Sequence, residues 1–440
     1  MTGGRESIAG TLALLGGTLA VLFGILLLDD EPASRFAGEE SLPGPDPERL
    51  LELGIRSTPR VARRVAAIRG LSFERIPEPQ LSEAADLVRK AERQLDRPRV
   101  KRALAMAQTE LRLLGLLEPD QELGKVATEV SSLAAAYYDP GPGELFLVGD
   151  AVPAGDQLTE FFLAHELTHA LEDQRFGLPQ GRGLSDDRLL AERALVEGTA
   201  TVLMNAYASR HLDPLALAVE AAGIDAGGGG ELPRFATAEV EFTYFGGAEF
   251  VAALRKLGSR WSLIDYAYKR RLPATTEQVL HPQKYLDDER GVEVAPPPSP
   301  GPGWRAVHTG TLGEFGTREV VRAGEHGIAG DLGADVSAAG WGGDRYRLFV
   351  RRGKPARCGD NCRATHALGV TWIGDAPVEA RELDQGLATY AEEALAGEAV
   401  GERAWRLDGG WAVLARRGQR VGLGLAPARR QAASLAGAVG

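Results

Sequence analysis

The residues best suited to chemistry in this chain are His165, Glu166 and His169, which form the pattern His-Glu-x-x-His. On an α-helix, residues four positions apart lie on one face, so the two imidazole rings would stand side by side and could bind one cation. Neutral imidazole is a good zinc ligand, and a catalytic zinc site uses three protein ligands and a water. Glu166 lies one residue further round the helix, where it could take a proton from that water. The pattern therefore predicts a zinc centre with Glu166 as its general base.

The segment around this pattern has the composition of a helix that other elements enclose. Residues 157–174 are apolar on several sides, and Asp156 is placed to act as the N-cap. The alternative interpretation is a buried helix whose histidines are merely packed and hydrogen-bonded. Two enclosed histidines and a glutamate need polar partners, and one metal ion satisfies all three, so we favour the metal centre.

The third protein ligand is expected from a second helix at residues 187–209, where Glu192 and Glu197 are the candidates. Glu197 shares a helix face with small and apolar residues, which indicates that it points inward. Gly198 follows it, and a glycine inside a helix often marks the close approach of another element. Glu192 lies beside Arg188, where a solvated ion pair is the simpler interpretation. We therefore predict Glu197 as the third ligand.

The segments His-Glu-Leu-Thr-His-Ala-Leu and Ala-Leu-Val-Glu-Gly-Thr-Ala together resemble the gluzincin branch of zinc metallopeptidases, which use two histidines and a distal glutamate. Tyr-Tyr-Asp-Pro and Thr-Thr-Glu-Gln-Val-Leu-His-Pro further resemble a bacterial group of membrane-anchored, largely uncharacterised His-Glu-x-x-His proteins. This resemblance covers about residues 137–286. It implies that His165, His169 and Glu197 bind zinc and that Glu166 is the general base. Thr201, and not an aspartate, stands four residues after Glu197.

Two further residues could support catalysis. Residues 242–257 are expected to start a helix that includes Tyr244. Its hydroxyl could donate a hydrogen bond to the oxyanion that forms when water attacks a carbonyl, although tyrosine side chains more often only pack. His281 could be a second donor, but its position before Pro282 favours a turn residue at the end of the domain.

The composition of the 440 residues is that of a globular protein long enough for two or three domains. A net charge of −11 and the lack of a strongly basic run argue against nucleic acid as a partner. Residues 8–28 form an uncharged, apolar stretch that is long enough to span a bilayer. We predict an uncleaved membrane anchor, with a cleaved secretory signal as the alternative. In both cases the body of the protein would lie outside the cytoplasm.

The expected domains are an anchor or signal at residues 1–30, a tether at 31–47, a helical zincin-like domain at 48–294, a proline-rich linker at 295–303 and a second domain at 304–440. Helices are expected at residues 59–70, 81–95, 100–117 and 123–138, and a flexible loop at 227–230. The helices before the site would support it or, alternatively, form a removable prosegment. A strand is expected at residues 144–148, where a free edge could pair with an extended peptide, with a plain structural hairpin strand as the alternative.

The pattern after the linker predicts a small α+β domain with an antiparallel sheet. Strands are expected at residues 346–351, 366–372, 411–416 and 421–425, and helices at 314–322, 378–395 and 429–438. Residues 340–346 are rich in glycine and are expected to form a turn before the first strand. Cys358 and Cys362 are the only cysteines and are predicted to form a disulfide, with two free thiols as the alternative.

The sequence thus predicts an exported, membrane-tethered zinc metallopeptidase of α+β class that acts on a peptide or protein substrate. One alternative is a non-catalytic envelope protein for binding or assembly, in which the metal site is structural. The intact Glu166 argues against that alternative, because a structural site has no need of a general base. Another alternative, a zinc hydrolase of a non-peptide amide, would use the same residues.

Overall fold

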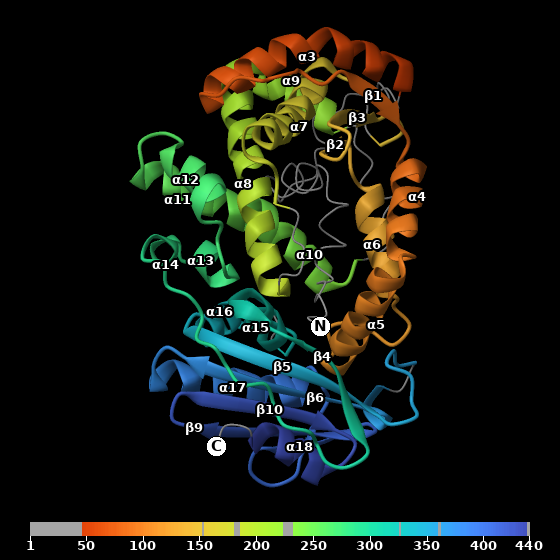
Figure 1. The fold of residues 1–440 in the computed structure, drawn as a ribbon, viewed down its shortest axis with the longest axis vertical. Coiled ribbons are helices and arrows are strands. Elements are labelled where there is room, and N and C mark those ends of the chain that lie inside the picture. The colour runs from red at the N-terminus through yellow and green to blue at the C-terminus, as the bar shows by residue number, and fades with distance from the viewer. Residues whose placement is uncertain are drawn as a thin grey trace.

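Two units of different architecture follow one another along the longest axis of the molecule, a helical unit and a unit built on a seven-stranded sheet (Figure 1). The computed structural model describes residues 46–437 apart from residues 152–153, 180–184, 223–231, 325–326 and 360–361. The expected α+β fold class is confirmed. The predicted anchor, most of the predicted tether and the predicted loop at 227–230 lie outside the described residues. None of the helices in the described part has the length and apolar character needed to cross a bilayer.

Helix α3 (Pro47–Arg69) covers one end of the helical unit (Figure 1). The sequence placed the start of this helix at residue 59, and this was wrong. The helix begins at Pro47, because the Asp46 side chain accepts a hydrogen bond from the backbone N–H of Arg49 and proline suits the first helical position. Pro59 lies inside the helix and does not end it. The helix stops at Gly70, which has a left-handed conformation with φ of 74°.

A small three-stranded sheet lies beside these helices, in the order β1-β3-β2. It consists of β1 (Pro79–Ser82), β2 (Ala136–Asp139) and β3 (Glu144–Val148). Strand β3 has the predicted bounds, but β1 and β2 flank it on both sides, so the hypothesis of a free β3 edge for a peptide is wrong. The helices expected at 81–95 and 123–138 are correspondingly shorter, because their outer residues pair with β3.

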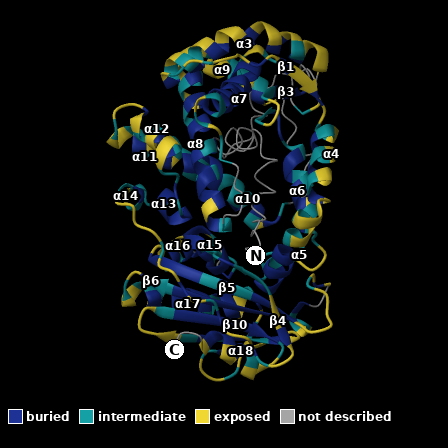
Figure 2. Cartoon of the chain, viewed as in Figure 1, coloured by how far each residue is buried: buried dark blue, intermediate teal, exposed yellow. Residues whose placement is uncertain are grey.

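Two long helices form the centre of the helical unit, α7 (Asp156–Phe176) and α8 (Asp186–His211). Figure 2 shows both as largely buried, whereas α3 exposes its outer face. The predicted N-cap of α7 was wrong by one residue, since Gly155 is the cap and Asp156 is the first helical residue, paired with Arg56. The other helices are α4 (Ala84–Leu95), α5 (Pro98–Leu113), α6 (Leu123–Ser132), α9 (Pro214–Ala221), α10 (Arg234–Glu241), α11 (Gly247–Leu257), α12 (Ser262–Arg270), α13 (Thr276–Leu280) and α14 (Pro282–Leu286), with a π-helical turn at Phe242–Gly246.

The second unit is built on a sheet with the strand order β4-β5-β6-β10-β9-β8-β7. The sheet is antiparallel, as predicted. Its strands are β4 (Trp304–Gly310), β5 (Trp341–Arg351), β6 (His366–Gly374), β7 (Glu398–Ala399), β8 (Ala404–Leu407), β9 (Gly410–Arg417) and β10 (Arg420–Ala426). Its helices are α15 (Gly313–Arg322), α16 (Gly327–Ala338), α17 (Pro377–Glu393) and α18 (Arg429–Ala436). The four predicted strands and three predicted helices are present, whereas β4, β7, β8 and α16 were not anticipated.

Of the glycine-rich residues 340–346, only Gly340 is in a turn, and residues 341–346 are part of strand β5, so most of the predicted turn was wrong. The glycines have a packing reason, because a Cβ atom on Gly343 would lie 2.5 Å from the carbonyl oxygen of Val292. The chain at residue 292 passes directly over this strand and donates a hydrogen bond from its N–H to the carbonyl of Gly342 at 2.6 Å. Cys358 and Cys362 form the predicted disulfide, with Cα atoms 5.1 Å apart.

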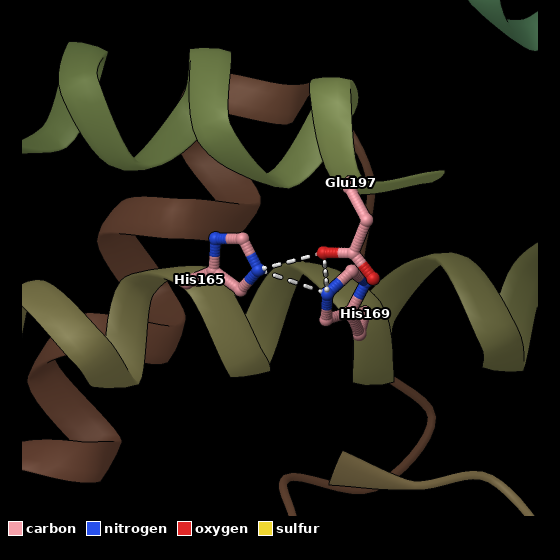
Figure 3. Close-up of side chains that lie close together, drawn as sticks. All are labelled: His165, His169 and Glu197. Atoms are coloured by element: carbon pink, nitrogen blue, oxygen red, sulfur yellow. Dashed lines mark hydrogen bonds and ion pairs between the residues drawn. The ribbon is translucent and has the colours of Figure 1, made fainter. Parts of the chain in front are cut away.

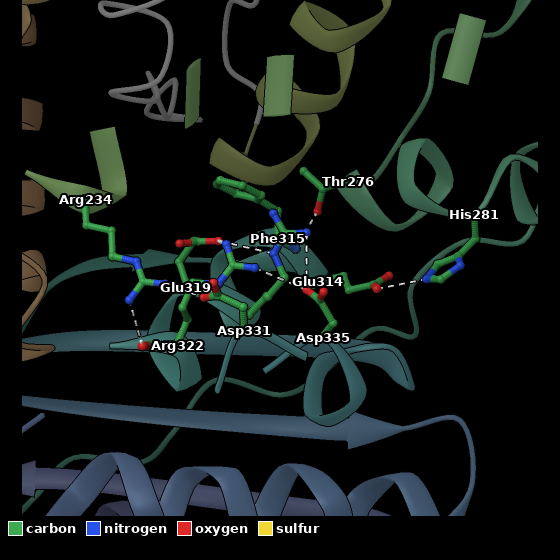
Figure 4. A network of polar contacts seen from close by, with 10 residues as sticks. Arg234, Thr276, His281, Glu314, Phe315, Glu319, Arg322, Asp331 and Asp335 are labelled. Atoms are coloured by element: carbon green, nitrogen blue, oxygen red, sulfur yellow. Dashed lines mark hydrogen bonds and ion pairs between the residues drawn. The ribbon is translucent and has the colours of Figure 1, made fainter. Parts of the chain in front are cut away.

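The two units share side chains across their boundary. Leu113, the last residue of α5, and Leu114 after it pack in the core of the sheet unit, and Phe315 of α15 packs in the core of the helical unit. The side chain of Thr276 donates to Asp187 of α8 at 2.6 Å and accepts from the backbone N–H of Phe315 at 3.1 Å, a chain of contacts visible in part in Figure 4. The helix that supplies the predicted third metal ligand is therefore anchored at its N-terminus to the sheet unit.

Candidate metal centre

Helix α7 presents His165 and His169 on one face, as their spacing predicts. Their rings have centroids 4.7 Å apart and planes at 81° to each other. The two Nε2 atoms lie 3.0 Å apart, so both rings direct the same nitrogen to one point (Figure 3). Both side chains are buried, His165 completely and His169 to 6% exposure.

Helix α8 brings Glu197 to the same point from the opposite side (Figure 3). Its Oε2 lies 3.2 Å from the Nε2 of His165 and 3.4 Å from the Nε2 of His169. A zinc ion with tetrahedral bonds of about 2.0–2.2 Å holds its ligand atoms roughly 3.3–3.6 Å apart. The three donor atoms therefore already stand close to the edges of such a tetrahedron, and they belong to the ligand types that zinc prefers.

The charges of the three side chains depend on one another. The histidines outweigh the effect of burial and lower the pKa of the Glu197 carboxyl well below its usual range. Burial would lower the pKa of His169, but the Glu197 carboxylate, with smaller effects from Glu166 and Glu172, raises it to about 9. A positive charge between the three donor side chains is therefore stabilised. A proton on a histidine can supply this charge, and so can a bound metal ion.

The hydrogen bonding of the outer ring nitrogens of the two histidines, the Nδ1 atoms, differs from that in most metal sites. Metal-binding histidines commonly donate the second ring N–H to a carboxylate or carbonyl oxygen. Within the described part of the chain, the Nδ1 atoms of His165 and His169 are buried and have no hydrogen-bond partner. Packing restrains the rings instead, and the ring of Tyr244 lies against that of His165 with centroids 5.9 Å apart.

Glu192, the other candidate for the third ligand, is not part of this cluster. It forms the expected ion pair with Arg188, with Oε1 3.0 Å from Nε. The Glu192 side chain is not solvated as the sequence suggested, since it is only 4% exposed, whereas Arg188 is 45% exposed. Its burial raises the pKa of the carboxyl, and the nearby Arg188 opposes this effect.

Glu166 and Tyr244 both lie in the protein interior near the histidines. Glu166 is 1% exposed and close enough to contribute to the raised pKa of His169. Tyr244 is 1% exposed and stands on the π-helical turn at Phe242–Gly246, a type of irregularity that is frequent at functional sites. His281 is not near the cluster, since it caps α14 and its Nε2 lies 2.9 Å from Glu314 of α15 (Figure 4).

A buried ion pair behind the site was missed by the sequence reasoning. Arg69 of α3 donates from Nε to Glu172 of α7 at 2.9 Å, and both side chains are fully buried. Its guanidinium also pairs with Asp265 at 2.7 Å and lies over the Trp261 ring, 4.7 Å from the centroid. Glu172 stands three residues after His169 on the same helix face, and this spacing was the available signal that it supports the metal-binding turn.

The comparisons with known proteins give one family match, which is confined to the sheet unit, and one structural match, which covers more of the chain. Residues 303–436 match a family described as a domain of unknown function, DUF8575, and this range does not include the metal-centre residues. No curated protein matches the chain. A solved structure from Chloroflexus aurantiacus, described as a putative hydrolase with a novel fold, has 17% identity over 64% of this chain and 98% of its own, with a TM-score of 0.38. A likeness this distant carries no argument about function, which therefore depends on the site itself.

Proposed function

We propose that this protein is a zinc-dependent hydrolase of peptide bonds, with His165, His169 and Glu197 as the metal ligands. The observation that carries the proposal is the convergence of two Nε2 atoms and one carboxylate oxygen within 3.0–3.4 Å of one another in the interior. Such a buried set is stabilised by a divalent cation, which replaces the solvation that the three groups lose on folding. When bound, zinc would supply a Lewis acid that polarises a carbonyl and lowers the pKa of a water.

The side chains around the ligands have complementary roles in this proposal. Glu166 follows His165 directly and takes a proton from the attacking water, then passes it to the leaving amine. Tyr244, stacked on His165, is proposed to donate a hydrogen bond to the oxyanion of the tetrahedral intermediate. The low-dielectric surroundings of both residues strengthen these interactions and exclude competing waters.

The alternative with a specific observation in its favour is a structural metal site. All three donor side chains are less than a tenth exposed, which also suits a metal that holds α7 and α8 together. This alternative gives no role to Glu166. Location in the cell envelope, by a membrane anchor at residues 8–28, remains part of the proposal for either function.

The test is the Glu166→Gln variant of the full-length protein, which keeps the size and hydrogen-bonding shape of the side chain but removes the base. We expect the zinc content measured by mass spectrometry to stay near the wild-type value, and hydrolysis of casein or a peptide library to fall roughly 10²–10⁴-fold. A chelator should abolish the wild-type activity, and added zinc should restore it. Zinc content without any hydrolysis in the wild type would favour the structural site, and full turnover in Glu166→Gln would exclude the proposed base.

A further inference from the structure

A surface groove of about 740 Å³ lies between α3, the end of α8 and the turn after α11, away from the metal centre. Its walls carry six arginines, which come from three separate parts of the chain: Arg60, Arg63, Arg64, Arg210, Arg255 and Arg260. This concentration of positive charge is notable in a protein with a net charge of −11. A local basic surface on an acidic protein indicates an anionic partner.

Only part of this positive charge is neutralised within the protein. Glu160 of α7 forms ion pairs with Arg60 and Arg64. Among the described residues, Arg63, Arg210 and Arg260 are exposed and have no ion pair or side-chain hydrogen bond. These three guanidinium groups are free to contact an external anion.

The arginines are also close enough to repel one another. Arg255 lies over the Trp261 ring at 4.3 Å from the centroid, and burial together with the charges of Arg210 and Arg69 lowers its pKa. The charges of Arg64 and Arg210, with burial as the first cause, likewise lower the pKa of His211. An anion in the groove would relieve this repulsion, which is a gain in binding free energy beyond the direct contacts.

Two exposed leucines are close in sequence to residues that line the basic groove. Leu257 directly precedes the turn that carries Arg260 and is 58% exposed, and Leu215, at the start of α9 after His211, is 69% exposed. Basic residues beside exposed leucines are the pattern of a surface that lies on an anionic bilayer, where the cations meet phosphates and the leucines enter the headgroup region. A nucleic acid fits less well, because the Trp261 ring in the groove lining is only 6% exposed and is covered by Arg255, so its face is not open for base stacking.

We infer that this groove is a docking surface for the phosphate headgroups of an anionic lipid membrane. The contact is electrostatic, and it orients the surface formed by α3, the end of α8 and the turn after α11 toward the bilayer. It is independent of the metal centre and of the activity proposed there. The groove would contact the membrane in the same way whether or not the protein is also tethered by the predicted anchor.

The experiment measures how full-length protein partitions onto vesicles of phosphatidylcholine alone and onto vesicles that also contain phosphatidylglycerol. The readout is the ratio of the two partition coefficients, because binding through the predicted anchor at residues 8–28 would add equally to both coefficients and cancel in the ratio. We expect a ratio on the order of tenfold in favour of the anionic vesicles at low salt, decreasing as salt is raised. The variant Arg63→Gln/Arg210→Gln/Arg260→Gln should bring the ratio close to one.

The matched control is Arg381→Gln/Arg417→Gln/Arg430→Gln, which removes the same charge from exposed positions of the sheet unit. It should keep the wild-type ratio, and an equal loss in this control would overturn the inference because it would show a general charge effect. Retention of the ratio in the groove variant would overturn it as well. Inorganic phosphate should compete no better than chloride at equal ionic strength, and selective competition by phosphate would replace the membrane with a soluble phosphate ligand.

Discussion

Gly198 of α8 and Gly247 of α11 meet backbone to backbone. A Cβ atom on Gly198 would lie 2.2 Å from the carbonyl carbon and oxygen of Gly247, and one on Gly247 would lie 2.1 Å from the carbonyl oxygen of Ala194. Only glycine at both positions allows the two helices to touch in this way. Because Glu197 adjoins Gly198, the contact also fixes the position of the turn that carries the proposed third metal ligand.

The first prediction follows from this contact. Gly198→Ala places a methyl group against backbone atoms that cannot rotate away, so α8 must shift from α11. We expect a loss of about 1–3 kcal/mol or more in the free energy of unfolding, measured with urea, together with weaker zinc binding. The control is Gly124→Ala in α6, where the nearest atom to an added Cβ is a leucine side-chain carbon at 3.5 Å and stability should not fall. Equal stability of the two variants would show that the helices have room to separate.

The second prediction distinguishes the two glutamates of α8. Glu197→Ala removes a donor atom that lies 3.2 Å and 3.4 Å from the two imidazole nitrogens, and we expect zinc affinity to fall by at least about 100-fold. Glu192→Ala removes only a partner of Arg188 and should leave the affinity within a few-fold of the wild-type value. Competition with a chromogenic chelator measures both. A site that loses zinc only in the Glu192 variant would require a different third ligand.

The donor cluster could be predicted from the sequence because its main signals are local. His165 and His169 are one helical turn apart, and the inward face of Glu197 follows from the residues around it on α8. The glycine after Glu197 correctly predicted the close approach of another helix, now identified as α11. What the sequence could not give is the distance between α7 and α8, which depends on packing of the whole helical unit.

The short strands β1 and β2 were not predicted from the sequence, and there is a physical reason for each. Strand β1 pairs in parallel with β3 across a long stretch of sequence, so nothing near residues 79–82 indicates the partner. Tyr137 and Tyr138 were read as the end of a helix, yet they pair with Phe146 and Leu145 across a turn at residues 140–143. That turn, with two aromatic residues before it and Leu-Phe-Leu-Val after it, was a recognisable hairpin signal.

The third prediction concerns Arg69, whose buried side chain pairs with the fully buried Glu172 three residues after His169. Arg69→Met removes the charge and leaves the Glu172 carboxylate uncompensated in the interior. We expect a loss of about 3–5 kcal/mol in the free energy of unfolding. The control Arg56→Met breaks an ion pair whose side chains are 56% and 52% exposed, and it should cost about 1 kcal/mol or less.

A double variant separates the lost charge from lost packing at this position. Arg69→Met/Glu172→Leu removes the fully buried carboxylate as well and leaves only Asp265, which is 28% exposed, without its Arg69 partner, so it should recover much of the stability lost in Arg69→Met. Urea denaturation of the two variants gives the difference directly. If the double variant is the less stable of the two, the cost of Arg69→Met arises from packing against Trp261 and not from the charge of Glu172.

The fourth prediction concerns how stability depends on pH through Asp187, an acidic residue at the boundary of the two units. Asp187, at the start of α8, accepts hydrogen bonds from the backbone N–H and the hydroxyl of Thr276, at 2.8 Å and 2.6 Å. It lines a cavity of about 150 Å³ together with Glu110 and Tyr346. Burial raises the pKa of Asp187 to about 7, against the opposing effect of Thr276. The folded state therefore binds a proton that the unfolded chain has lost between pH 4 and 7.

The sign of the pH dependence follows from this difference. A carboxyl with a raised pKa in the folded state makes the free energy of unfolding fall as the pH rises from about 4 to about 7. In Asp187→Asn the amide oxygen can still accept from Thr276, but no proton is lost, so this contribution of up to about 4 kcal/mol disappears. Urea denaturation at pH 5 and pH 8 should give a smaller decrease for Asp187→Asn than for the wild type, whereas the control Asp156→Asn, at the exposed start of α7, should follow the wild type. Parallel pH profiles of Asp187→Asn and wild type would mean that Asp187 is ionised throughout, and that its hydrogen bonds to Thr276 outweigh the effect of burial.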